Sequence, residues 1–190
     1  MSNLLKISLP VAGLLMSLSA FGSPWQASEK CQLNQSQPAG LYPQAAKTLS
    51  DLELTPRITQ GLNQSISSQN VHGVDDVIDK VPYTAAVDIS VKCLVGDQDS
   101  KIKDLLRTLA ESGFVGWYRQ NGRDGWKGPN HVHAIWIKQK LKPSLAKQVN
   151  SWLQGKNGLK SNLDYEYWQP TADLKGRVKG YLREASVGSR

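Results

Sequence analysis

Two of the three histidines in this 190-residue chain, His131 and His133, lie two positions apart within the apolar run that ends at Trp136. Side chains along a β-strand alternate between its two faces, so both imidazoles would point to the same side. Burying two imidazoles on one face of an apolar strand is costly unless each finds a partner. The pair therefore predicts either a metal or proton-transfer site, or a polar cluster whose hydrogen bonds are satisfied near the end of the strand.

A carboxylate on a second predicted strand is a candidate partner. Residues 84–95 alternate in character, and one face is apolar, formed by Ala85, Val87, Ile89, Val91 and Cys93. Asp88 projects from the opposite face beside the small Ala86, which leaves room for another group to approach. A carboxylate and imidazoles are typical ligands of catalytic zinc, which lowers the pKa of a bound water towards about 7. The same residues would also suit a metal-free arrangement in which Asp88 orients one histidine by a hydrogen bond.

The pattern of elements around these residues predicts a single α+β domain with a small central antiparallel sheet flanked by helices. Helical spacing is found at residues 42–54, 56–66, 101–112, 143–154 and 171–184. A glycine-punctuated loop at 119–129 separates a short strand at 114–118 from the histidine strand. Because the histidine strand is apolar on both faces, we expect it in the centre of the sheet. The third histidine, His72, falls in the polar, irregular segment 65–79.

The first 22 residues have the features of a secretion signal. Lys6 supplies a positive charge, residues 7–18 are apolar, and Ala20-Phe21-Gly22 resembles a cleavage site. The apolar run is too short for a good transmembrane anchor. We therefore expect an exported protein, periplasmic or secreted, with an extended N-terminal tail at 23–41 and a domain at 42–190.

Two cysteines, Cys31 and Cys93, follow the predicted signal. In an oxidising compartment such a pair usually forms a disulfide, which here would tie the tail to a central strand. Loop-closure entropy gives such a bridge a contribution of roughly 4 kcal/mol. Two buried free thiols are the alternative.

Positive charge is concentrated in the last third of the chain. The whole sequence has a formal net charge of +7, and residues 138–190 contain eleven Lys or Arg against four Asp or Glu. This excess favours an anionic envelope partner, such as a cell-wall polymer or a lipid headgroup, although a solvated helical surface would look the same. Nucleic acid fits the charge but not an exported location.

The order of motifs resembles the Hedgehog/DD-peptidase superfamily, which includes zinc D-alanyl-D-alanine peptidases that cut peptidoglycan peptides. That pattern is His-x-x-Gly-x-Ala-x-Asp, then a glycine-containing strand, then His-x-His. Here it corresponds to residues 81–88, a leucine-rich helix, residues 113–118 and residues 131–133, so the resemblance covers about 81–137. It implies a peptidase-like fold, a zinc cofactor and a peptidoglycan peptide as substrate.

Carried over by position, the resemblance makes Asp88 and His133 zinc ligands and gives His131 the role of assisting catalysis. The first histidine ligand of the family falls on Val81, which cannot bind zinc, and the motif glycine falls on Thr84. Three outcomes follow. His72 supplies the third ligand from its loop, or His131 becomes that ligand, or the domain has lost zinc and serves as a binding module for cell-wall peptides or another protein.

Two residues of the long loop are further candidates for substrate contact. Arg123 and Trp126 could line a groove, since loops on a rigid scaffold often carry function. A solvated loop with a tucked-in indole is the alternative.

Overall fold

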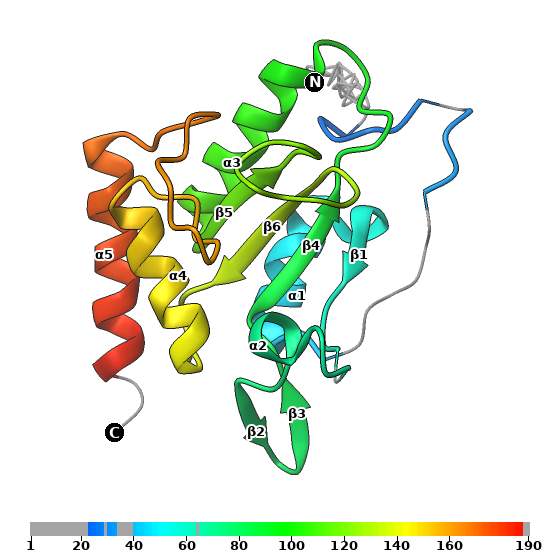
Figure 1. Cartoon of the computed structure of the whole chain (residues 1–190). Helices are drawn as coiled ribbons and strands as arrows, with labels where there is room; N and C mark the ends of the chain where they lie inside the picture. Colours follow the sequence, from blue (N-terminus) through cyan, green and yellow to red (C-terminus); the bar gives the residue numbers. More distant parts are fainter. Residues whose placement is uncertain (1–22, 29, 34–39, 64, 188–190) are drawn as a thin grey trace, which may run out of the picture.

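The computed structural model describes residues 23–28, 30–33, 40–63 and 65–187, and the predicted signal peptide lies outside these ranges. The chain has the expected α+β architecture, built on a four-stranded antiparallel sheet in the order β1-β4-β6-β5 (Figure 1). The four strands are β1 (Ile58–Gln60), β4 (Ala86–Ser90), β5 (Phe114–Arg119) and β6 (His131–Trp136). The histidine strand β6 is central, as predicted.

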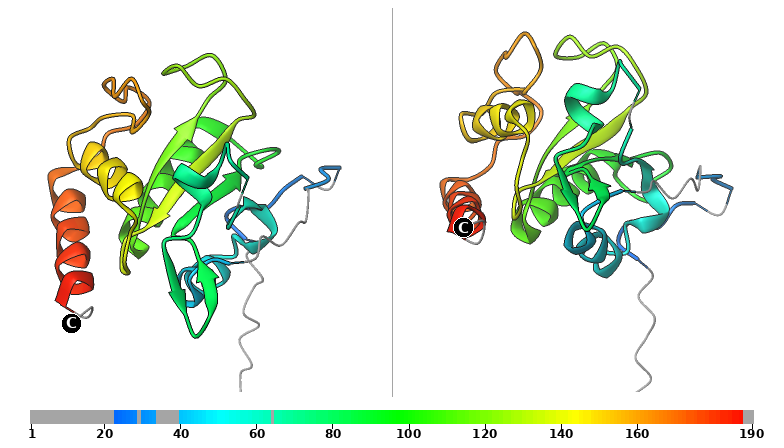
Figure 2. Two further views of the ribbon diagram at one scale, coloured as in Figure 1. Left: turned by 60° about the horizontal axis from the view of Figure 1, so that its bottom comes forward. Right: turned by 90° about the horizontal axis from the view of Figure 1, so that it is seen from below.

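A separate hairpin and five α-helices complete the described part of the chain. The hairpin pairs β2 (Asp76–Ile78) with β3 (Val81–Tyr83), and it projects beyond the end of the main sheet (Figure 1). The helices are α1 (Pro43–Asp51), α2 (Gln69–His72), α3 (Gln98–Ser112), α4 (Pro143–Leu153) and α5 (Ala172–Val187). Figure 2 shows α4 and α5 at one side of the molecule and α1 at the other. None of the described helices combines the length and apolar character needed to cross a bilayer.

Helix α3 packs against one face of the sheet and leaves the other face for a site. Its ends match the sequence signals, because the Asp97 side chain accepts a hydrogen bond from the Asp99 amide and Gly113 ends the helix in the left-handed region. A Cβ at Gly116 in β5 would touch Leu106 of α3, so the even-numbered positions of β5 face this helix. The neighbouring odd positions of β5 therefore face the opposite side of the sheet.

The helix predicted at 56–66 is wrong. The chain forms only a 3₁₀ turn at Thr55–Arg57 and then enters β1, where Ile58 pairs with Ile89. Arg57 is buried, and its guanidinium donates to the backbone carbonyls of Trp25, Ser90 and Lys92. These contacts with distant segments outweigh the local helical spacing, and Ile66, the last residue of the predicted helix, is 91% exposed.

The predicted disulfide between Cys31 and Cys93 is confirmed, with a Cα–Cα distance of 6.1 Å. Cys93 comes three residues after β4 ends, so the bridge attaches the N-terminal segment to the continuation of a central strand. Ala27 also forms a β-bridge with Leu94, and Trp25 is buried in the hydrophobic core. The N-terminal segment is therefore integrated into the domain at these points.

Candidate metal centre

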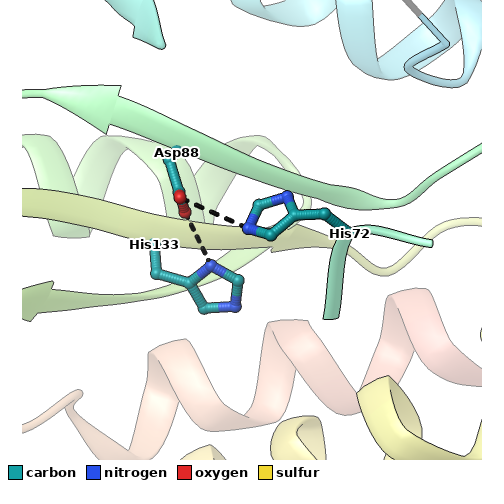
Figure 3. A group of neighbouring side chains, drawn as sticks. All are labelled: His72, Asp88 and His133. Carbon is teal, nitrogen blue, oxygen red and sulfur yellow. Dashed lines mark hydrogen bonds and ion pairs between the residues drawn. The ribbon is translucent and has the colours of Figure 1, made fainter. Parts of the chain in front are cut away.

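All three histidines of the chain meet at one carboxylate. Asp88 Oδ1 lies 2.9 Å from His133 Nδ1 and 3.5 Å from His131 Nε2, and Asp88 Oδ2 lies 3.3 Å from His72 Nε2. Figure 3 shows Asp88 between the rings of His72 and His133. One ligand atom from each of Asp88, His72 and His133 can be chosen so that the three lie within 4.8 Å of one another.

The sheet sets the positions of Asp88, His131 and His133. In the antiparallel ladder of β4 and β6, Asp88 is directly opposite His133 and Ser90 is opposite His131. Because side chains alternate along each strand, Asp88 and both histidines share the face turned away from α3. The shared side of His131 and His133 was predicted from the sequence. Trp117 of β5, opposite His133 on the other side, lies nearly parallel to its ring with the ring centres 6.1 Å apart.

His72 reaches the same carboxylate from outside the sheet. It is the last residue of α2, it is buried, and its Nδ1 lies 3.2 Å from the carbonyl oxygen of Gly61. A proton on Nδ1 would be donated to that carbonyl, and Nε2 would then offer its lone pair to a cation beside Asp88. Without a cation, Nε2 donates to Asp88 only when it carries a proton itself. The structure thus places His72 where the first of the three outcomes requires it.

The cluster is electrostatically unusual because it is buried. Burial lowers the pKa of His133 to about 4, despite the opposing effect of Asp88, so the ring is neutral at pH 7. Burial also opposes ionisation of Asp88, but hydrogen bonds with His133 and His72 outweigh it and hold the pKa of Asp88 below its ordinary range. At neutral pH the centre therefore presents one carboxylate and a neutral His133 ring, the forms that bind a metal.

One ring nitrogen at this centre has no partner. His133 Nε2 is buried and makes no hydrogen bond within the described structure, while Nδ1 contacts Asp88. This nitrogen lies on the side of the ring away from Asp88, so the His133 atom that would face an ion held with Asp88 and His72 is Nδ1 (Figure 3). Two imidazoles and a carboxylate match the donor set of zinc sites. The residues present therefore fit a zinc ion.

His131 lies at the edge of the centre. Its Nδ1 is 2.9 Å from the carbonyl oxygen of Pro129, which leaves Nε2 facing Asp88. The indole of Trp126 contacts the His131 ring edge to face, with ring centres 5.1 Å apart. His131 is thus held beside the cluster by the loop that precedes its strand, with one ring nitrogen available for proton transfer.

The centre opens into a cleft of about 700 Å³ between the sheet, α2, α4 and the segment that follows α4. Among the described residues that line the cleft, Asp88 is the only acid, whereas Arg119, Lys147 and Lys160 are basic. The remaining lining residues are mostly polar and include Gln60, Ser67, Ser68, Asn70, Ser144, Gln148, Ser151 and Asn162. An anionic ligand would suit this lining.

Arg119 is a cleft residue that the sequence did not reveal. It ends β5, is 3% exposed, donates from Nη1 to the Asn157 carbonyl at 2.6 Å, and lies over the Trp117 ring. Burial lowers its pKa to about 10, so it stays charged at neutral pH. The predicted strand ended one residue too early, at Tyr118. Extending it by one residue puts Arg119 on the face of Trp117, opposite His131.

The other predicted residues divide between the cleft and the surface. Trp126 lines the cleft, whereas Arg123 is exposed and is absent from the described lining. Val81 is likewise absent from that lining: it pairs with Ile78 in the hairpin and is 45% exposed. The residue on which the resemblance put a first histidine ligand therefore lies outside the described lining of the cleft, and it is His72 that contacts Asp88.

Comparison with protein-family models, curated proteins and solved structures finds no match to this chain. The centre and its cleft are therefore the features from which a function can be inferred.

Proposed function

We propose that this protein is an exported zinc-dependent hydrolase that acts on peptides. The observation that carries the proposal is the convergence of buried His72 and buried His133 on the partly buried Asp88 carboxylate. A zinc ion held by these three residues would supply Lewis acidity and a water of lowered pKa. The Cys31–Cys93 disulfide supports export, because such bridges persist mainly in oxidising compartments.

The surrounding side chains suit specific tasks in hydrolysis. His131, with its Nε2 directed towards the cluster, is placed to accept or deliver a proton. Arg119, Lys147 and Lys160 give the cleft a positive lining that would attract a substrate bearing carboxylates. The resemblance to zinc D-alanyl-D-alanine peptidases points to peptidoglycan peptides, which are carboxylate-rich, as the substrate class.

A non-catalytic binding domain is the second candidate. The hydrogen bond between His133 Nδ1 and Asp88 is favourable without any metal, and His72 Nε2 lies near the other carboxylate oxygen. Such a hydrogen-bonded cluster could persist as a structural element beneath a cleft that binds anionic cell-wall peptides. The two candidates differ in whether zinc binds.

Zinc titration of the metal-depleted protein separates them. We expect one zinc per chain in the parent, and loss of binding in Asp88→Ala because both histidines lose the ligand between them. Asp76→Asn is the control, because Asp76 lies in the hairpin, where its carboxylate pairs with the exposed Lys140 rather than with a histidine of the centre. The zinc-loaded parent should hydrolyse peptides that end in D-alanyl-D-alanine, and His131→Ala should lower that rate while retaining zinc.

A parent that binds no zinc would refute the hydrolase proposal and leave the binding domain. A parent that binds zinc through Asp88 but cleaves no peptide would retain the metal centre and contradict the proposed substrate.

A further inference from the structure

We propose that Lys142 and Ser144, at the start of α4, are positioning residues that dock α2 and thereby place His72 in the metal centre. This inference rests on the proposed function, because it concerns the third ligand of the same site. It assigns a role to the beginning of α4, where neither residue belongs to the His72, Asp88 and His133 cluster.

The need for docking follows from the size of α2. This helix has four residues, and no described side chain caps its N-terminus. Isolated helices shorter than about 12 residues are marginal in water, so a single turn has no stability of its own. The position of His72 must therefore be fixed by contacts with other elements.

Two side chains at the start of α4 hold the backbone of α2. Lys142 Nζ donates to the carbonyl of Gly73 at 2.6 Å, directly after His72, and Ser144 Oγ donates to the carbonyl of Asn70 at 2.5 Å. These two carbonyls flank the histidine in sequence. Carbonyls at a helix C-terminus lack partners within the helix, so such donors satisfy groups that would otherwise be free.

Buried Asp75 joins this docking point to the strand that bears Asp88. Its Oδ1 accepts the Lys142 amide at 2.8 Å, and its Oδ2 accepts the Ala85 amide at 2.8 Å and the Thr84 hydroxyl at 3.1 Å. Lys142 Nζ lies 3.7 Å from the same carboxylate. The start of α4 thus contacts both α2 and the residues just before β4. These contacts fix the position of His72 relative to Asp88.

The test compares zinc affinity in three variants. Lys142→Met keeps the aliphatic stem but removes the donor to Gly73, and we expect a 10–100-fold loss of zinc affinity, the range typical when a partner that orients a ligand is removed. Ser144→Ala should cause a smaller loss and serves as the second variant if Lys142→Met does not fold. Lys140→Met is the matched control, because Lys140 is two residues away, largely exposed and paired only with Asp76 in the described ion pairs.

The direction in which zinc affinity changes in Lys142→Met distinguishes a loss of docking from a simple loss of positive charge. Removing a lysine near the centre removes repulsion of a cation, so charge alone would raise zinc affinity. An unchanged or higher affinity in folded Lys142→Met, measured well below its melting temperature, would overturn the inference.

Amide hydrogen exchange in the metal-free protein provides an independent measurement. The His72 amide bonds to Ser68, and the His72 carbonyl accepts the amide of Asn63. The amides of His72 and Asn63 should exchange faster in Lys142→Met than in Lys140→Met. Unchanged exchange would overturn the inference, regardless of the zinc affinities measured. Faster exchange together with a parent that binds no zinc would support docking and refute the proposed hydrolase.

Discussion

The two walls of the cleft hold their candidate ligands by different means. Asp88 and His133 face each other across the ladder of β4 and β6, the two central strands of the sheet. His72 stands on a single helical turn that is attached by side-chain hydrogen bonds from α4. The wall formed by β4 and β6, here called the sheet wall, is therefore part of the hydrophobic core. The wall formed by α2, here called the α2 wall, is a short segment attached to that core.

This difference predicts how the walls respond to change. A strand in the centre of a sheet opens only when the domain unfolds, but a short docked segment can open locally at a lower free energy. Perturbing the core should therefore change global stability, and perturbing α2 should change metal affinity with little effect on global stability.

Reduction of the disulfide should give the largest change in stability. Cys31 and Cys93 are 62 residues apart, and a loop of that length corresponds to about 4 kcal/mol in the chain-entropy account. We expect reduced protein to melt several degrees lower, and both cysteines to resist alkylation until they are reduced. Zinc affinity, measured where both forms are folded, should be unchanged because neither cysteine lines the described cleft. If reduction lowered zinc affinity as much as replacing a ligand does, the stability of the core and the metal affinity would not be separable, and the comparison of the two walls would be wrong.

Mild acid should produce the next largest effect, through His133 on the sheet wall. Its pKa is about 4 in the folded protein and about 6.5 in the unfolded chain, so the unfolded chain takes up a proton first as the pH falls. In metal-free protein the free energy of unfolding is therefore highest, as far as His133 is concerned, above pH 6.5. It falls between pH 6.5 and 4, by about 3 kcal/mol in total. Urea unfolding at several pH values measures it, and His133→Gln should flatten the profile in this window. A parent profile that is flat from pH 7 to 4 would contradict the buried, neutral state of His133.

Val81→His should have the smallest effect on zinc affinity. The residue lies on the exposed hairpin rather than beside Asp88, so a histidine there should leave zinc affinity unchanged. His72→Ala is the comparison, and should lose most of the binding. A large gain in affinity from Val81→His would show that the hairpin reaches the centre and that α2 is not the source of the third ligand.

The sheet wall could be predicted from the sequence because it depends on local alternation. The period-two pattern at 84–95 placed Asp88 opposite the apolar face of its strand, and the two-residue spacing of His131 and His133 placed both histidines on one side of theirs. Pairing of the two strands in antiparallel register then brings Asp88 opposite His133. The alternation within each strand is local, whereas the register that brings Asp88 opposite His133 comes from the pairing of the two strands.

The α2 wall could not be predicted in the same way. The contact of His72 with Asp88 depends on Lys142, 69 residues away from its acceptor Gly73, and no local pattern encodes such a pairing. The same reason explains the false helix at 56–66, where burial of Arg57 against three distant carbonyls and pairing of Ile58 with Ile89 decide the structure.

The buried guanidinium of Arg57 also shows that the part of the chain that folds as one unit includes residues before the domain boundary predicted from the sequence. Its Nε donates to the carbonyl of Trp25, and the Trp25 side chain fills part of the core, so a chain shortened to start at Gly40 would lose an acceptor, an aromatic ring and the disulfide together. The boundary between tail and domain expected at residues 41 and 42 is thus not a boundary of stability.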